Sequence, residues 1–134
     1  MFRLAILAQP NSWYARDLQR NATGDESISL LSYRDLQTYT LPQVAFGSSG
    51  QAISDEPSKA FDCLLVRSMP LGSLEQVIFR VNSLHAAHGL GCCVVNSPRT
   101  LEIAIDKWLT LATVAKEGID VPRTAVCQTR DQAM

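Results

Sequence analysis

The sequence predicts an α/β fold in which a mainly parallel sheet carries helices on both faces. Nearly continuous apolar runs of strand length recur along the chain, as in strands that are covered on both faces. Segments with apolar residues at three- and four-residue spacing, typical of helices that pack on a sheet, separate these runs. Strands and helices that alternate at such lengths are usually joined by right-handed crossovers.

The first quarter of the chain predicts a strand, a helix and a second strand. Residues 2–8 (FRLAILA) predict the central strand of the sheet. In the polar loop that follows, Asn11 or Ser12 can cap a helix that runs to about residue 22. Residues 26–33 (ESISLLSY) predict the second strand.

The next segment is less regular. Residues 34–46 are ambiguous, and a short third strand interrupted by Pro42 is one interpretation. Residues 47–60 are rich in Gly, Ser and charge and have no apolar period, so they predict an exposed loop. Their GSSG stretch lacks the pattern and the strand-to-helix setting of a phosphate-binding loop.

The strand–helix pattern then resumes. Residues 61–69 (FDCLLVRSM) predict a strand, and its apolar centre gives way to Arg67. The spacing of Leu74, Val77, Ile78, Val81 and Leu84 predicts a long helix. A serine at position 73 can cap this helix, and a glycine at position 89 lies near its end.

The last part of the chain predicts a strand, a helical segment and a final strand. Residues 92–96 predict a short buried strand, and the Ser-Pro pair after it marks the start of a helix. Asp106 can cap a second helix that begins at Lys107, so one bent helix and two helices both remain open. Gly118 and Pro122 close this segment, and residues 123–129 (RTAVCQT) predict a new strand.

Composition excludes several classes of function. A chain of 134 residues with 46% hydrophobic residues suits one domain with its own core. Its 12 basic and 13 acidic residues give a net charge of -1, which offers no positive field for nucleic acid or anionic membranes. The first apolar run is too short for a secretory signal or a membrane span, so we expect a soluble, cytoplasmic protein.

The sequence does not predict a metal site. Cys63, Cys92, Cys93 and Cys127 include no C-x-x-C pair, so we interpret them as reduced core residues. Two histidines three positions apart on the long helix have no acidic or cysteine partner to complete a ligand set. A solvated helix face is the favoured interpretation of this histidine pair.

Polar residues follow three of the predicted strands, where the carboxyl ends of parallel strands commonly bind ligands. They are Gln9, Asn11 and Ser12 in the first loop, Arg67 and Ser68 in the second, and Asn96 and Ser97 in the third. Their chemistry suits a small anionic or polar ligand, and we take Asn11, Arg67, Ser68 and Asn96 as candidate substrate-binding residues. The guanidinium of Arg67 could grip a carboxylate, although a structural ion pair or a solvated charge would also explain it.

The second half of the chain resembles a known family. The stretch VRSMPLGSLEQVIFRVNSLHAAHGLG, the segment VVNSPRTLEIAIDK and the closing GIDVPRT are similar to the N-terminal part of RimK-type ATP-grasp ligases. This family includes ribosomal-protein glutamate ligases and the ligases that add glutamate to tetrahydromethanopterin or to a deazaflavin cofactor. The resemblance covers residues 66–129, whereas the first 60 residues match only in strand–helix order.

The resemblance implies a division of the chain and a missing part. Residues 1–97 correspond to a Rossmann-like pre-ATP-grasp domain, and residues 98–134 to a helical linker and first strand that lead toward an ATP-grasp domain. In the family, the nucleotide-clamping lysine strand, the phosphate loop and the acidic magnesium ligands lie further downstream. The resemblance therefore implies a fragment of a longer enzyme that has no catalytic residues of its own and is inactive alone.

The resemblance also implies an activity for the full-length enzyme. Such ligases use ATP and Mg²⁺ to convert a carboxylate to an acylphosphate, which an amine attacks to form an amide. Lys107, in the DK dipeptide, corresponds to a lysine that contacts the ATP phosphates, although an exposed lysine at a helix start is the alternative. Arg67 would face the cleft between domains, and the partners would be the chain's own ATP-grasp domain and amino-acid-like carboxylate and amine substrates.

Two other classes of function stay open at this point. A non-catalytic module that binds a small ligand or docks a protein could use the same fold. An independent mononucleotide- or flavin-binding domain is also conceivable, but QPNSW stands where its glycine fingerprint would be. The reading frame beyond Met134 would discriminate between a ligase and a module, and a homo-oligomer is compatible with any of these classes.

Overall fold

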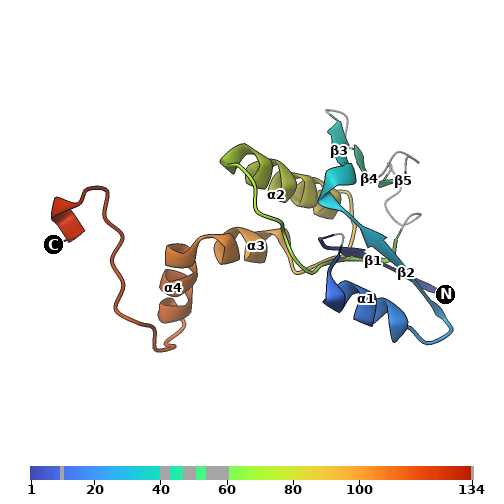
Figure 1. Cartoon of the computed structure of the whole chain (residues 1–134), viewed down its shortest axis with the longest axis horizontal. Helices are drawn as coiled ribbons and strands as arrows, with labels where there is room; N and C mark the ends of the chain where they lie inside the picture. Colours follow the sequence, from blue (N-terminus) through green and yellow to red (C-terminus); the bar gives the residue numbers. More distant parts are fainter. Residues whose placement is uncertain (10, 40–42, 47–50, 54–60, 134) are drawn as a thin grey trace. The chain divides into compact units, whose positions relative to one another are not determined.

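The computed structural model describes residues 1–9, 11–39, 43–46, 51–53 and 61–133 (Figure 1). The chain divides into two compact units, Met1–Pro98 and Arg99–Met134, and each is described by itself.

The first unit contains a four-stranded parallel sheet with the strand order β2-β1-β6-β7. Its strands are β1 (Phe2–Leu7), β2 (Glu26–Leu31), β6 (Cys63–Val66) and β7 (Val94–Val95). Strand β1 is an inner strand, in which Leu4 lies opposite Ile28 on one side and Cys63 on the other. The predicted Rossmann-like α/β class is confirmed, although each strand is shorter than the apolar run that predicted it.

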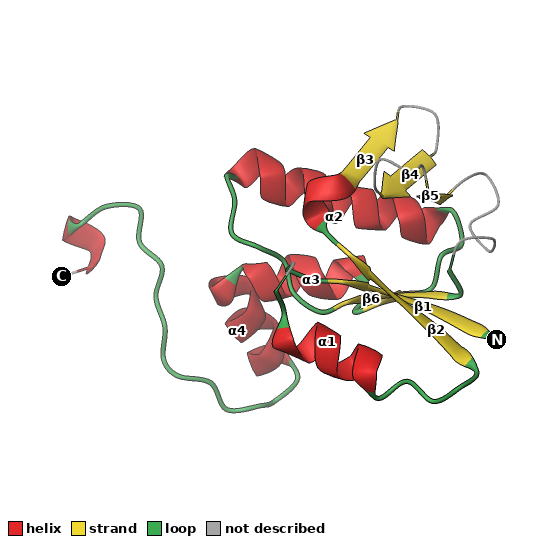
Figure 2. Ribbon diagram, turned by 45° about the vertical axis from the view of Figure 1, so that its right-hand side comes forward, coloured by secondary structure: helices red, strands yellow, loops and turns green. Residues whose placement is uncertain are grey.

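Two helices cover opposite faces of this sheet (Figure 2). Helix α1 (Trp13–Arg20) connects β1 to β2, and α2 (Leu74–Gly89) connects β6 to β7. Of the two predicted caps for α1, it is the hydroxyl of Ser12 that accepts a hydrogen bond from the Ala15 N–H, at 3.3 Å. The cap of α2 is Ser73, whose hydroxyl accepts from the Gln76 N–H while the Gln76 side chain accepts from the Ser73 N–H.

The core of the first unit lies around β1 and β6. Ala5, Ile6, Leu7 and Leu64 are completely buried, and Val66 and Leu84 are 1% exposed. Burial of such side chains stabilises a fold by about 1.5–3 kcal/mol each. Because β1 is covered on both faces, its sequence is a continuous apolar run rather than an alternating one.

A second, antiparallel sheet follows β2. A short 3₁₀ turn, η1 (Tyr33–Asp35), leads into β3 (Leu36–Tyr39), which pairs with β4 (Gln43–Phe46), and β4 pairs with β5 (Gln51–Ile53). The predicted loop over residues 47–60 is therefore wrong at β5, whose three residues are too few to show an apolar period but are held by pairing with β4. Pro42 and the rest of that loop lie outside the described residues.

The second unit contains two helices, in the segment where the sequence allowed either one bent helix or two. Helix α3 (Pro98–Ile105) and helix α4 (Lys107–Lys116) are separate helices. Asp106 caps α4, because its carboxylate accepts a hydrogen bond from the Leu109 N–H at 2.9 Å. Between residues 99 and 133 no side chain is buried.

The strand predicted over residues 123–129 is wrong. This segment has no strand assignment and is followed by a 3₁₀ turn, η3 (Asp131–Ala133). A β-strand needs a neighbour with which to exchange hydrogen bonds, and no described strand pairs with these residues. The side chain of Gln132 instead accepts hydrogen bonds from the backbone N–H groups of Gln128 and Thr129.

The four cysteines are free, but only one of them is a buried core residue. Cys92 is buried, Cys63 and Cys127 are partly exposed, and Cys93 is exposed. The prediction that all four belong to the core is therefore wrong for Cys93, because successive residues of an extended chain point in opposite directions. It is also wrong for Cys127, which lies in a segment without buried residues. Burial raises the pKa of Cys92, and that of Cys63 rises to about 11, mainly through burial and its contact with Cys93.

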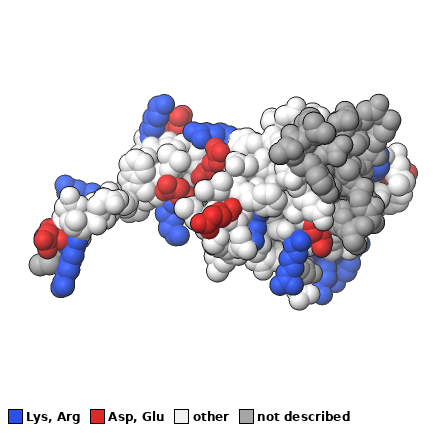
Figure 3. All heavy atoms as spheres, turned by 90° about the horizontal axis from the view of Figure 1, so that it is seen from above, with Lys and Arg blue, Asp and Glu red and all other residues white. Residues whose placement is uncertain are grey.

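On the face seen in Figure 3, basic and acidic side chains are interspersed among the residues drawn in colour. Of the helices that the structure describes, none is long and apolar enough to cross a membrane.

One ion pair joins the starts of the two inner strands. Arg3 Nη2 lies 2.9 Å from Asp62 Oδ1, and the Arg3 backbone N–H donates to Asp62 Oδ2 at 2.6 Å. The Asp62 N–H in turn donates to the Arg3 carbonyl at 2.8 Å. Hydrogen bonds from the Arg3 side chain and backbone lower the pKa of Asp62 below its ordinary value.

We expect this ion pair to make stability depend on pH in acid. Because the folded-state pKa of Asp62 is lowered, its contribution is complete above the ordinary carboxyl pKa of about 4 and is lost as the pH falls through the folded-state value. Asp62→Asn should lower the urea midpoint of unfolding at neutral pH, and the deficit should shrink toward about pH 3. Exposed Asp120 provides the control variant Asp120→Asn, and a deficit of Asp62→Asn that is constant with pH would contradict the assignment.

Candidate functional site

The strand order creates a topological switch point between β1 and β6. The crossover from β1 leads to β2 on one side, whereas β6 pairs with the other side of β1 and its crossover leads away to β7. The loops that leave the carboxyl ends of β1 and β6 therefore diverge. In parallel sheets, ligands bind in the crevice at such a point.

A groove of about 370 Å³ lies at this point. Its lining includes Gln9, Asn11, Trp13 and Tyr14 from the segment after β1, and Arg67 and Ser68 from the segment after β6. We call it the Arg67 groove. The Arg67 N–H donates to the carbonyl of Leu7 at 3.0 Å, so the ends of the two inner strands fix the backbone from which the Arg67 side chain extends.

Two exposed aromatic rings form one wall of the Arg67 groove. Trp13 and Tyr14 are 59% and 58% exposed, and their ring centroids lie 5.2 Å apart in an edge-to-face arrangement. The guanidinium carbon of Arg67 lies 4.4 Å from the Tyr14 ring centroid, a cation–π distance. A guanidinium whose face is stacked still presents its N–H edge, which is the edge that binds carboxylates.

The structure brings three of the four candidate substrate-binding residues together. Asn11, Arg67 and Ser68 all line the Arg67 groove. Asn96 does not line this groove, and its side-chain N–H₂ donates to the carbonyl of Val66 at 3.3 Å. Its amide thus joins the ends of β7 and β6, and the binding roles of all four residues stay predictions.

Trp13 and Tyr14 lie next to each other at the start of α1, and neither was among the candidate binding residues. Adjacent residues of a helix point about 100° apart, so two neighbouring large rings cannot both face a sheet. Their adjacency was therefore the signal that could have assigned them to a surface site. Both rings are exposed, and both line the Arg67 groove.

A second groove, of about 640 Å³, opens on the same edge of the sheet. Gln9 lines it as well as the Arg67 groove, together with Tyr33, Arg34, Gln76, Phe79 and Arg80. We call it the Arg80 groove. No local pattern groups Arg34 with Arg80, since the 3₁₀ turn η1 carries the first and helix α2 carries the second.

Tyr33 forms the buried wall of the Arg80 groove. It is 7% exposed, and its hydroxyl has no hydrogen-bond partner among the residues that the structure describes. Burial raises the pKa of Tyr33, so the phenol stays protonated. The guanidinium carbon of Arg80 lies 5.6 Å from the centroid of its ring.

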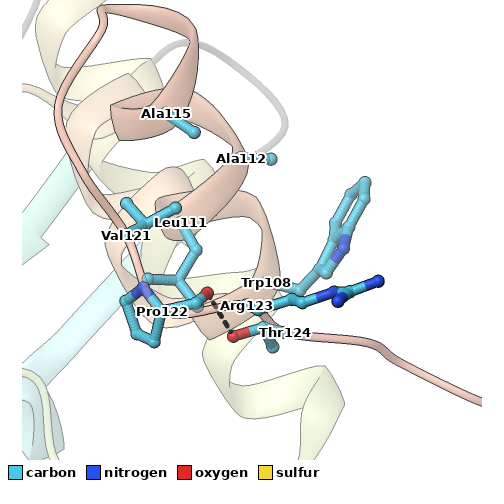
Figure 4. Close-up of a pocket in the computed structure, with 8 residues that line it drawn as sticks. All are labelled: Trp108, Leu111, Ala112, Ala115, Val121, Pro122, Arg123 and Thr124. Carbon is cyan, nitrogen blue, oxygen red and sulfur yellow. Dashed lines mark hydrogen bonds between the residues drawn. The ribbon is translucent and has the colours of Figure 1, made fainter.

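The second unit carries a mainly apolar groove of about 380 Å³ (Figure 4). Trp108, Leu111 and Ala115 of α4 line one side of it, and Val121 and Pro122 of the following segment line another. The Thr124 hydroxyl donates to the Pro122 carbonyl at 2.9 Å. Lys107, the predicted phosphate contact, is exposed as the first residue of α4 and does not line this groove.

Metal ligands do not gather in the described part of the chain. No three His, Cys, Asp or Glu side chains lie there in a group that could hold a metal ion.

Comparison with known proteins relates the chain to a glutamate ligase. A segment of 73 residues, 54% of the chain, is 33% identical to a tetrahydromethanopterin:alpha-L-glutamate ligase of Methanosarcina acetivorans. The matched segment makes up 22% of that protein, so the chain spans about a fifth of its relative's length. The chain matches no family model. The similarity supports the ligase class at a coarse level.

Proposed function

We propose that this chain is the N-terminal, substrate-side part of an ATP-dependent carboxylate–amine ligase of the glutamate-adding, RimK-like ATP-grasp type. The similarity to a glutamate ligase over 73 residues is the observation that carries this proposal. The Arg67 groove, at the point where a parallel sheet binds ligands, is consistent with a substrate-binding role. Cytoplasmic location is part of the proposal, because the reaction consumes ATP.

In this proposal, the Arg67 groove binds an anionic group of a substrate. The Arg67 guanidinium would hold two oxygens of a carboxylate in one plane, while Asn11 and Ser68 supply further hydrogen bonds. Fixing one anionic group of the substrate in this way orients the rest of the molecule and lowers the entropic barrier to its reaction. MgATP, when bound by the whole enzyme, supplies the phosphoryl group that activates the carboxylate.

In this proposal, the described residues supply only one part of the nucleotide site. Lys107 is one exposed ammonium group, and the N-terminal end of a helix, where it lies, disfavours a cation. The Asp106 carboxylate already occupies the N-terminal end of α4, so a phosphate would contact the Lys107 ammonium rather than the backbone N–H groups of the helix. A single contact offsets little of the cost of immobilising a nucleotide, so we propose that the 134-residue chain alone is inactive.

The proposal is tested with the protein made from the whole reading frame. We expect this protein, given MgATP, L-glutamate and a panel of carboxylate acceptors that includes tetrahydromethanopterin, to release ADP only when both organic substrates are present. ADP release and incorporation of labelled glutamate are the measurements. A whole-frame protein that binds these ligands but never releases ADP would instead support the non-catalytic module.

Lys107→Ala should raise the KM for ATP in that assay about tenfold or more, because a charge-assisted contact to phosphate is lost. The melting temperature should stay unchanged, since Lys107 is exposed. Lys116→Ala, in the last turn of the same helix, is the matched control and should leave the KM for ATP unchanged. An unaltered KM for ATP in Lys107→Ala would assign Lys107 to the solvated surface.

Arg67→Ala should raise the KM for the acidic substrate about tenfold to a hundredfold, with the KM for ATP little changed. Arg67→Lys should recover only part of the loss, because an ammonium cannot bind a carboxylate through two parallel hydrogen bonds. Arg20→Ala is the control, since Arg20 is an exposed residue of α1 that pairs with Asp17. Unchanged steady-state constants in Arg67→Ala would return Arg67 to a structural role beside Tyr14.

A further inference from the structure

The Arg80 groove gathers positive charge at the carboxyl edge of the sheet. Two arginines, Arg34 and Arg80, line it, and none of its lining residues in the described part of the chain is Asp or Glu. Asp35, which follows Arg34 in η1, lines a neighbouring groove instead. A groove of this charge attracts anions.

Arg80 is a half-buried cation, and the described residues include no acidic partner for it. Its Nη1 donates to the carbonyl of Pro70 at 2.7 Å, and no described carboxylate forms an ion pair with it. A buried arginine is usually paired, because removing its charge from water is costly. The hydrogen bond to Pro70 uses one of five N–H donors, so donors remain for a ligand.

The loop before α2 holds Arg80 in this position. A methyl group added at Gly72 would lie 2.9 Å from Arg80 Nη1 and 2.6 Å from Gln76 Oε1. An alanine at this position would therefore require the ends of both flexible side chains to move. The ring of Tyr33, 5.6 Å from the guanidinium carbon, lies against another side of Arg80. The guanidinium is thus oriented before any ligand arrives, which lowers the cost of binding.

Apolar side chains lie in the same groove as the two arginines. Leu71 is 99% exposed and Phe79 is 42% exposed, and both line the groove. Inorganic phosphate could use the arginines but would leave these apolar surfaces in water. An acid with an apolar body would cover them and gain from their burial.

We propose that the Arg80 groove binds a small organic acid, with the carboxylate held by Arg80 and Arg34 and the apolar part against Phe79 and Leu71. Two guanidinium groups supply parallel hydrogen bonds that match a carboxylate. The proposal does not depend on ligase activity, because it concerns binding by this chain in the absence of ATP.

The test is a titration of the 134-residue chain with benzoate, acetate and inorganic phosphate, followed by the amide signals in nitrogen-15 NMR spectra. We expect benzoate to bind more tightly than acetate or phosphate and to shift the amides of η1 and of the first turns of α2. Arg80→Gln should weaken benzoate binding about tenfold or more, and Arg34→Gln by a smaller factor of about three. Arg20→Gln removes an equal charge from outside the groove and should change nothing.

A conservative variant separates the position of Arg80 from its charge. Gly72→Ala keeps both arginines but displaces Arg80 and Gln76, so it should weaken benzoate binding while leaving the net charge unchanged. If Arg80→Gln fails to fold, Arg34→Gln and Gly72→Ala still decide the question. The proposal is overturned if benzoate does not bind, if phosphate binds more tightly than benzoate, or if Arg34→Gln and Gly72→Ala bind benzoate like the wild type.

Discussion

The structure of the first unit depends on the burial of β1 between β2 and β6. Ala5, Ile6 and Leu7 are completely buried, and β1 forms parallel hydrogen bonds with a strand on each side. Such a strand cannot move without exposing apolar side chains and breaking both ladders. Because the crossovers from β1 and β6 lead in opposite directions, the same pairing also fixes where the two loops diverge.

The side chains that can bind a ligand extend from loops which this buried pairing holds in place. The Arg67 N–H bonds to the Leu7 carbonyl, at the very end of β1. Arg80 is oriented by the Pro70 carbonyl, in the segment after β6. Gln9, just beyond the carboxyl end of β1, lines both grooves, so the two grooves meet there. A rigid sheet that presents adjustable loops is a common way to place binding residues.

The sequence was a good guide to whatever depends on local pattern. The parallel sheet, the capped helices and the start of α4 at Lys107 could all be predicted, because apolar runs, serine caps and Asp106 act over a few residues. Pairing between distant segments could not be predicted in this way. Strand β5 exists through its pairing with β4, and residues 123–129 form no strand because no described strand pairs with them. The positions of strand ends were enough to group Asn11, Arg67 and Ser68 in one groove. The hydrogen bond from Asn96 to Val66 and the proximity of Arg34 to Arg80 depend on the fold and could not be predicted from local pattern.

The central claim is that β1 and β6 form the rigid, buried pair on which the binding edge rests. Native-state hydrogen exchange measures this directly, because it reports the free energy with which each amide becomes exposed. We expect the amides of Ile6, Leu7 and Val66 to exchange only through global unfolding, and those of Asn11 and Ser68 to exchange through local opening. Exchange of the Ile6 and Leu7 amides as fast as that of the loop amides would contradict the account.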